Sequence, residues 1–157
     1  MEPRTPPSAD PADAALDYGS YVRVDDLLAL QHPRSRPEHP DELLFIVVHQ
    51  ASELWFKVIL HEIDALVAAL ERRETMFAVL AVRRLNALVR IVSAHLSALD
   101  TLPPQRFAQF RGYLGTSSGS QSAQFRAIEA ASGLREAHYL QALEEHGPVP
   151  PAVRAAL

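Results

Sequence analysis

The amino-acid sequence predicts an all-α protein, a bundle of helices, and three observations support this fold class. Apolar residues recur at helical spacing over long stretches, as in Leu85, Leu88, Val92, Leu96 and Leu99. Prolines and glycines separate those stretches at the places where helices would end. No segment alternates apolar and polar residues in the period of two that is typical of a half-buried strand.

Composition divides the chain into an arm, a helical domain and a tail. Residues 1–17 hold four prolines and no helical period, which predicts a disordered N-terminal arm. Residues 18–147 carry the helical patterns and are expected to form one domain. Residues 148–157 contain three prolines and are expected to form a Pro-rich tail.

The first half of the domain should contain a long helix. A short helix is expected near the end of 18–31, followed by a proline-punctuated loop over 32–40. Asp41 then stands at an N-cap position, and Glu42 favours the positive end of the helix dipole. The helix that begins there should run over 41–72.

Three more helices are expected after it. The next covers 76–99, and Pro104 can open a short helix that runs through about 113. Ser118 and Gln121 have the spacing of a capping box at the start of the last helix, 119–131. The helical spacing assigns eight side chains to the buried face of the bundle: Leu44, Val48, Trp55, Ile59, Leu88, Val92, Phe125 and Ile128.

Composition and charge exclude several function classes. The formal net charge of -4 gives no electrostatic reason to expect a nucleic acid as a partner. The absence of cysteine excludes disulfides and thiolate chemistry and fits a reducing cytoplasm. The longest uninterrupted apolar run, 43–48, is far too short to cross a bilayer, and the N-terminus lacks a signal-peptide core. We therefore expect a cytoplasmic protein with no membrane partner.

A histidine interrupts the most apolar part of the predicted long helix. Phe45 and His49 are four residues apart and share one helix face, which Ser52 and Phe56 continue. A histidine in such a run costs desolvation free energy unless it is hydrogen-bonded. The local sequence leaves two interpretations open: a core histidine satisfied by a neighbour, or a histidine that faces a pocket and serves in hydrogen bonding or proton transfer.

The stretch from Phe107 to Glu129 is rich in hydrogen-bonding groups. Phe107 and Arg111 share a helix face just before a loop of glycines and hydroxyl residues. The planar guanidinium fork of an arginine suits a carboxylate, and an adjacent aromatic ring suits a ligand that is both apolar and acidic, such as an aromatic amino acid. A structural salt bridge from Arg111 to one of the acidic residues is the alternative.

Two segments carry a resemblance to a known family. HPDELLFIVVHQASELWFK and FRGYLGTSSGSQSAQFRAIE resemble the two signature segments of the tryptophan 2,3-dioxygenases, in the same order, and the resemblance spans 18–129. It implies an all-helical haem b enzyme, typically a homotetramer. Such an enzyme inserts both atoms of O₂ across the C2–C3 bond of the indole of L-tryptophan, or of a substituted tryptophan, and yields N-formylkynurenine in tryptophan catabolism.

The resemblance also implies roles for individual residues. His49 falls on the distal histidine that hydrogen-bonds the indole N–H, Phe45 on the aromatic that packs against the indole, and Arg111 on the arginine that binds the substrate carboxylate. Phe107 stands where the family usually has a tyrosine that supports this carboxylate. Ser118 and Gly119 fall on the loop that runs over the haem and the substrate. Tyr18 and Tyr21 fall on a pair of tyrosines that reaches into the pocket of a neighbouring subunit.

The family's axial haem ligand has no match in this sequence. It is a histidine on a later helix, which would lie beyond Leu157, so no metal ligand is identified here. Three interpretations stay open: a truncated or split dioxygenase with a separate C-terminal half, a haem protein with another ligand, or a shortened paralogue. Two function classes follow, an oxygenase and a non-catalytic module for oligomerisation or substrate binding.

Overall fold

The computed structural model describes residues 17–134, and every regular element in that range is helical. The predicted all-α class is thus confirmed. The chain divides into two compact units, one that ends at His32 and one that begins at Pro33. The predicted boundaries at 17/18 and 147/148 stay predictions, because residues 1–16 and 135–157 lie outside the described range.

The first unit contains two short helices, α1 (Tyr18–Val22) and α2 (Val24–Leu28), joined at Arg23 in a left-handed conformation with φ of 56°. The Asp17 carboxylate caps α1 by accepting the Ser20 backbone N–H at 2.7 Å. Helix therefore begins at Tyr18, earlier than the end of 18–31 where we expected it, because the Asp17–Ser20 capping box was not recognised as a start signal.

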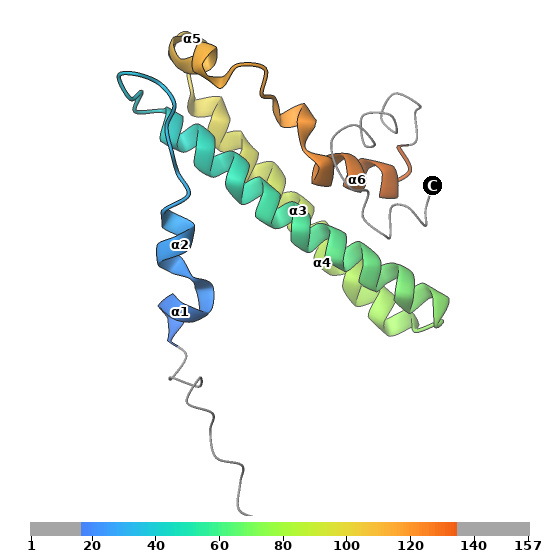
Figure 1. Ribbon diagram of the computed structural model, residues 1–157. Coiled ribbons are helices and arrows are strands. Elements are labelled where there is room, and N and C mark those ends of the chain that lie inside the picture. Colours follow the sequence, from blue (N-terminus) through green and yellow to red (C-terminus); the bar gives the residue numbers. More distant parts are fainter. Residues whose placement is uncertain (1–16, 135–157) are drawn as a thin grey trace, which may run out of the picture. The chain divides into compact units, whose positions relative to one another are not determined.

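The second unit is organised around a hairpin of two long helices. In Figure 1, α3 (Glu42–Glu71) and α4 (Thr75–Leu96) lie side by side and run in opposite directions, and α6 (Ala123–Ala131) lies along α3. Between α4 and α6 come a 3-10 turn η1 (Ser97–Thr101), α5 (Pro104–Arg111), and the 3-10 turns η2 (Gly112–Leu114) and η3 (Gly119–Gln121). All four predicted helices of this unit are present, although three of the predicted ranges include a 3-10 turn at one end.

The core lies in the seam between α3 and α4. Phe56 and Ile59 from α3 pack on Leu88 and Val92 from α4, and Ile128 of α6 packs against this cluster. Of the predicted core residues, Val48, Ile59, Leu88 and Val92 are buried, whereas Leu44, Trp55 and Ile128 are half-buried.

Phe125 is a correction to the predicted core, because 37% of its surface is exposed. The helix α6 approaches α3 through two small side chains, Ala127 and Ala130, which pack on Leu60. Phe125 therefore lies at the edge of this contact, with its ring 5.5 Å from that of Phe56.

The beginning of α3 is held by two acidic residues in different ways. Asp41 occupies the N-cap position, as predicted, but its side chain does not cap the helix, and this role was wrong. Its carboxylate instead pairs with Arg106 of α5, with 2.9 Å between Nη2 and Oδ1. Glu42 is fully buried and accepts the backbone N–H groups of Arg34 and Ser35 at 2.7 and 3.0 Å, together with the Ser35 hydroxyl.

By length and composition alone, α3 could cross a membrane, since one 18-residue window has a mean hydropathy of 1.6. Our criterion of an uninterrupted apolar run missed this, because the window tolerates a few charged residues. The same composition suits a helix at the centre of a bundle, and α3 packs on both α4 and α6.

The hydrogen bonds to Glu42 make it a pH-dependent anchor. Burial would raise the pKa of this carboxyl, but the donors from Arg34 and Ser35 outweigh burial and hold the pKa below its ordinary value of 4.5. A carboxyl with a lowered pKa stabilises the fold above its unfolded-state pKa. We therefore expect the free energy of unfolding to fall as the pH drops below about 4.5, through the folded-state pKa.

Replacing Glu42 by alanine should lower the free energy of unfolding at pH 7 by about 2 to 4 kcal/mol, because three donors lose their acceptor. Urea denaturation followed by circular dichroism measures this. The control is Glu38→Ala, since Glu38 forms only an exposed 3.9 Å pair with Arg36 and should change stability by less than about 0.5 kcal/mol. Equal effects of both variants would contradict the anchoring role.

Candidate functional site

A cavity of about 450 Å³ lies between the first half of α3 and the loop that precedes α6. It brings together four of the predicted site residues, Phe45 and His49 from α3 and Ser118 and Gly119 from the loop, although about seventy residues separate the two pairs. The remaining lining residues are Ile46, Gln50, Glu53, Leu114, Ser117, Gln121 and Ser122.

The hydrogen bond of His49 determines which of its ring nitrogens faces the cavity as an acceptor. Nδ1 lies 2.7 Å from the backbone oxygen of Phe45, and a carbonyl only accepts, so Nδ1 carries the proton in the neutral ring. Nε2 is then left with a lone pair. A Cβ placed on Gly119 would lie 3.6 Å from Nε2, so Nε2 is next to the loop at this glycine. His49 thus offers an acceptor to an N–H donor.

An aromatic cluster fixes the ring next to His49. Phe45 lies with its centroid 4.2 Å from that of His49, and its other side contacts Phe107 and Phe110 of α5 at 5.4 and 5.8 Å. Phe110 is fully buried and meets Phe107 edge-on at 5.3 Å. Phe107 therefore packs against Phe45 and is not among the residues that line the cavity.

Arg111 lies at the end of α5, close in sequence to the loop. Its Nη1 donates to the backbone oxygen of Gly115 at 2.8 Å, and it forms no ion pair with a described residue. It is not among the residues that line the cavity, so its assigned contact with a substrate carboxylate stays a prediction. Tyr18 and Tyr21 belong to the first unit, where they are 78% and 77% exposed, and their roles stay predictions as well.

Serines shape the loop at two points. Ser118 and Gln121 form the predicted capping box. However, it caps the 3-10 turn η3 and not the helix that we expected over 119–131. Ser122 caps α6 by accepting the Phe125 backbone N–H at 3.1 Å, so α6 begins at Ala123. The break between η3 and α6 gives the loop the bend that carries Gly119 over His49.

Glu53 is the functional candidate that our reasoning from sequence missed. It lines the cavity one helical turn after His49, and both its carboxylate and its backbone oxygen accept from Nε2 of Gln124, at 2.7 and 3.0 Å. This contact joins α6 to α3 at the edge of the cavity. The spacing of four residues from His49 was the available signal, because it places Glu53 on the same helix face.

No group of three or more His, Cys, Asp or Glu side chains within 17–134 could hold a metal ion. In the lining of the cavity, which consists entirely of described residues, His49 is the one imidazole. The site can therefore accept hydrogen bonds through Nε2 and hold an apolar ring against Phe45. It contains no second histidine.

Comparison with known proteins identifies the family of the chain. The tryptophan 2,3-dioxygenase family matches residues 5–146. The chain is 46% identical over 133 residues to a tryptophan 2,3-dioxygenase of Kineococcus radiotolerans, covering 85% of this chain and 46% of that protein. It is 44% identical over 153 residues to that of Anaeromyxobacter dehalogenans, covering 98% and 56%. It is 48% identical over 128 residues to that of Herpetosiphon aurantiacus, covering 81% and 49%.

Two facts follow from these matches. The chain spans about half the length of the curated relatives that it matches. The range matched by the family, residues 5–146, spans the positions of both sequence segments and of the four predicted residues that line the cavity. The chain belongs to the tryptophan 2,3-dioxygenase family.

Proposed function

We propose that this chain provides the indole-binding part of a haem-dependent tryptophan 2,3-dioxygenase, which cleaves the C2–C3 bond of L-tryptophan, or of a substituted tryptophan, with O₂ and yields N-formylkynurenine. The relatives at 44–48% identity carry that name, and the proposal extends it to this chain. The observation that carries it is the bonded Nδ1 of His49, which leaves Nε2 as an acceptor beside the Phe45 ring.

An indole fits these two groups. Its N–H is a donor and its ring system is apolar, so one ligand can satisfy Nε2 and pack on the face of Phe45 at the same time. The hydrogen bond would orient the ring and would strengthen as positive charge develops on the indole in the transition state. His49 is in this proposal the catalytic residue of the chain.

The amino-acid part of the substrate would lie toward α5. Arg111 uses one N–H for Gly115, which leaves most of its guanidinium fork for a carboxylate. Phe107 has no hydroxyl to assist, and we expect the loss of that hydrogen bond to weaken binding by about 1 kcal/mol.

The residues of the cavity suit contact with the substrate beside a haem better than they suit ligation of the haem iron. Ile46, Leu114 and Phe45 give apolar surface, and the absent side chain of Gly119 leaves space beside Nε2. An axial ligand distinct from His49 is not among the described lining residues, so it would come from outside them. When bound, haem would bind O₂ and activate it.

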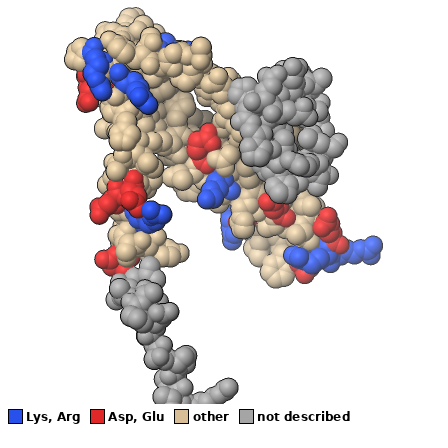
Figure 2. Space-filling model, viewed as in Figure 1, with Lys and Arg blue, Asp and Glu red and all other residues tan. Residues whose placement is uncertain are grey.

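We also propose a homo-oligomer, a tetramer as the family implies, in the cytoplasm. On α3, Leu43, Val47, Leu54 and Val58 form one stripe, and each is between 38% and 51% exposed. Figure 2 shows charged side chains of both signs scattered over the visible face, with wide uncharged areas between them. Such a surface favours contact with another chain, and Tyr18 and Tyr21 are exposed candidates for it. Sedimentation showing a soluble monomer at micromolar concentration would contradict this.

The test of the proposed reaction uses the full chain, haem that a chemical reductant has converted to the ferrous state, L-tryptophan and isotopically labelled O₂. We expect a product that contains both labelled oxygen atoms, detected by mass spectrometry. A parallel sample adds a polypeptide equivalent to the second half of the Kineococcus radiotolerans relative, because this chain spans 46% of that protein. Absence of labelled product in both samples would exclude the dioxygenase assignment.

Gly119→Ala should weaken the binding of tryptophan to the full chain without unfolding it. The added Cβ would lie 3.6 Å from Nε2 of His49, which is an ordinary contact distance but occupies the path of an N–H donor. Isothermal titration measures the dissociation constant. Gly112→Ala is the matched control, because a Cβ there meets nothing within 4 Å. Equal effects at both glycines would argue against ligand binding at Nε2.

Arg111→Ala should weaken the binding of L-tryptophan roughly 10- to 100-fold, the loss expected for a hydrogen-bonded charge pair of about 1.5 to 3 kcal/mol. Tryptamine, which lacks the carboxylate, should bind equally to the variant and to the unchanged protein. Titration of both ligands separates loss of this contact from loss of the fold, and a parallel loss of tryptamine binding would exclude the assigned role.

In a complete haem site, the same variant should raise the KM for tryptophan more than His49→Ala does, while His49→Ala should lower kcat.

A further inference from the structure

A second cavity lies at the far end of the α3–α4 hairpin. It has a volume of about 450 Å³ and lies between the last turns of α3 and the first turns of α4. Its lining is mostly apolar, and Leu70, Val79 and Val82 are 60%, 42% and 43% exposed. We refer to it as the hairpin groove, lined by Leu66, Ala69, Leu70, Arg73, Glu74, Thr75, Ala78, Val79, Val82 and Arg83.

We propose that residues 136–145 of this same chain dock in the hairpin groove. The proposal is independent of the reaction proposed above. The direction of α6, the apolar pattern of the segment and its charge favour this occupant.

Chain direction brings the segment to the groove. Gln124, in the first turn of α6, bonds Glu53 of α3, whereas Ala130, in the last turn, packs with Leu60, so α6 advances along α3 toward the groove. Leu66 lies about 9 Å beyond Leu60 at the rise of an α-helix, a distance that about three extended residues would span. The described chain leaves α6 through Gly133, which has a φ of 97°.

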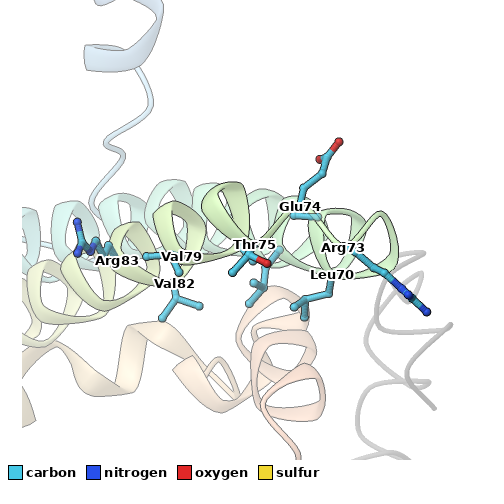
Figure 3. A pocket seen from close by; sticks show the side chains of 10 residues that line it. Leu70, Arg73, Glu74, Thr75, Val79, Val82 and Arg83 are labelled. Atoms are coloured by element: carbon cyan, nitrogen blue, oxygen red, sulfur yellow. The ribbon is translucent and has the colours of Figure 1, made fainter.

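The groove also opens on the appropriate side of the hairpin. Figure 3 shows the side chains of Leu70 and Val82 pointing to the side on which α6 lies, whereas Glu74 points away from it. Ile128 of α6 packs against the α3–α4 seam through the cluster that includes Leu88. The hairpin groove therefore continues the seam that α6 covers.

The pattern and charge of the segment match the groove. Tyr139, Leu140 and Leu143 have the spacing of one apolar helix face. The segment also carries three acidic residues, Glu136, Glu144 and Glu145. Arg73 lines the groove and forms no ion pair with a described residue, so it can pair with one of these carboxylates. The sequence match to the family extends to residue 146, which includes the whole segment in the family domain.

Engineered cysteines test the proposal in the full chain, which has none of its own. Val82→Cys is combined with Leu140→Cys or with Leu143→Cys, because a disulfide needs Cα atoms roughly 4.4–6.8 Å apart and one of the two positions should satisfy this. Mild oxidation should then give an intrachain disulfide, identified by peptide mass spectrometry. The matched control is Leu80→Cys, which is 48% exposed in the same helix but lines a different cavity.

We expect cross-linking from position 82 to be several-fold faster than from position 80. Equal rates from both positions, disulfides only between two chains, or unreacted thiols in every pair would each overturn the proposal. A second measurement covers the case in which cysteines perturb the fold. Leu140→Ser with Leu143→Ser should speed amide hydrogen exchange over 66–82, whereas Val149→Ser with Val153→Ser should not, and unchanged exchange in the first variant would also overturn the proposal.

Discussion

The contact between α6 and α3 is the interaction on which the candidate site depends. Ala127 and Ala130 present almost no side chain, so the backbone of α6 approaches Leu60 closely. The bond from Gln124 to Glu53 then fixes where along α3 the helix begins. Since the loop with Gly119 directly precedes α6, these two contacts place the loop over His49. A larger residue at position 127 or 130 would push α6 outward and widen the cavity.

The beginning of α3, which carries Phe45 and His49, is held by contacts with α5 and with the loop that precedes α3. The aromatic cluster of Phe45, Phe107 and Phe110 fixes α5 against α3, and the pair of Arg106 with Asp41 ties the beginnings of the two helices together. The bonds of Glu42 to Arg34 and Ser35 then close the preceding loop over the same end. His49 therefore lies between two independently anchored elements, which limits the rearrangement needed when a ligand enters.

Sequence reasoning predicted the helices and four of the eleven residues that line the cavity, and the physical reason is locality. Spacing along one helix is visible in the sequence, so Phe45 with His49, and Leu88 with Val92, could be identified. Contacts between helices depend on which helix faces pack together, and the spacing of residues along one helix does not indicate this. This is why Asp41 was expected to cap its own helix although it pairs with Arg106, and why Phe125 was expected in the core in place of Ala127. The role of Glu53 depends in the same way on Gln124, seventy-one positions later.

The hydrogen bond of His49 is compatible with two roles for Nε2, as a metal ligand or as an acceptor from an N–H donor. The position of the loop favours the acceptor role. A histidine whose Nδ1 donates to a backbone carbonyl has the arrangement of many metal ligands, so Nε2 could in principle bind an iron. However, a methyl group at Gly119 would lie 3.6 Å from Nε2 and 3.8 Å from Cδ2, so the loop backbone passes close to this edge of the ring. A flat macrocycle centred on Nε2 would have to occupy the same space. A single N–H donor needs far less room and approaches along one direction. The acceptor role therefore fits the described geometry better than metal ligation does.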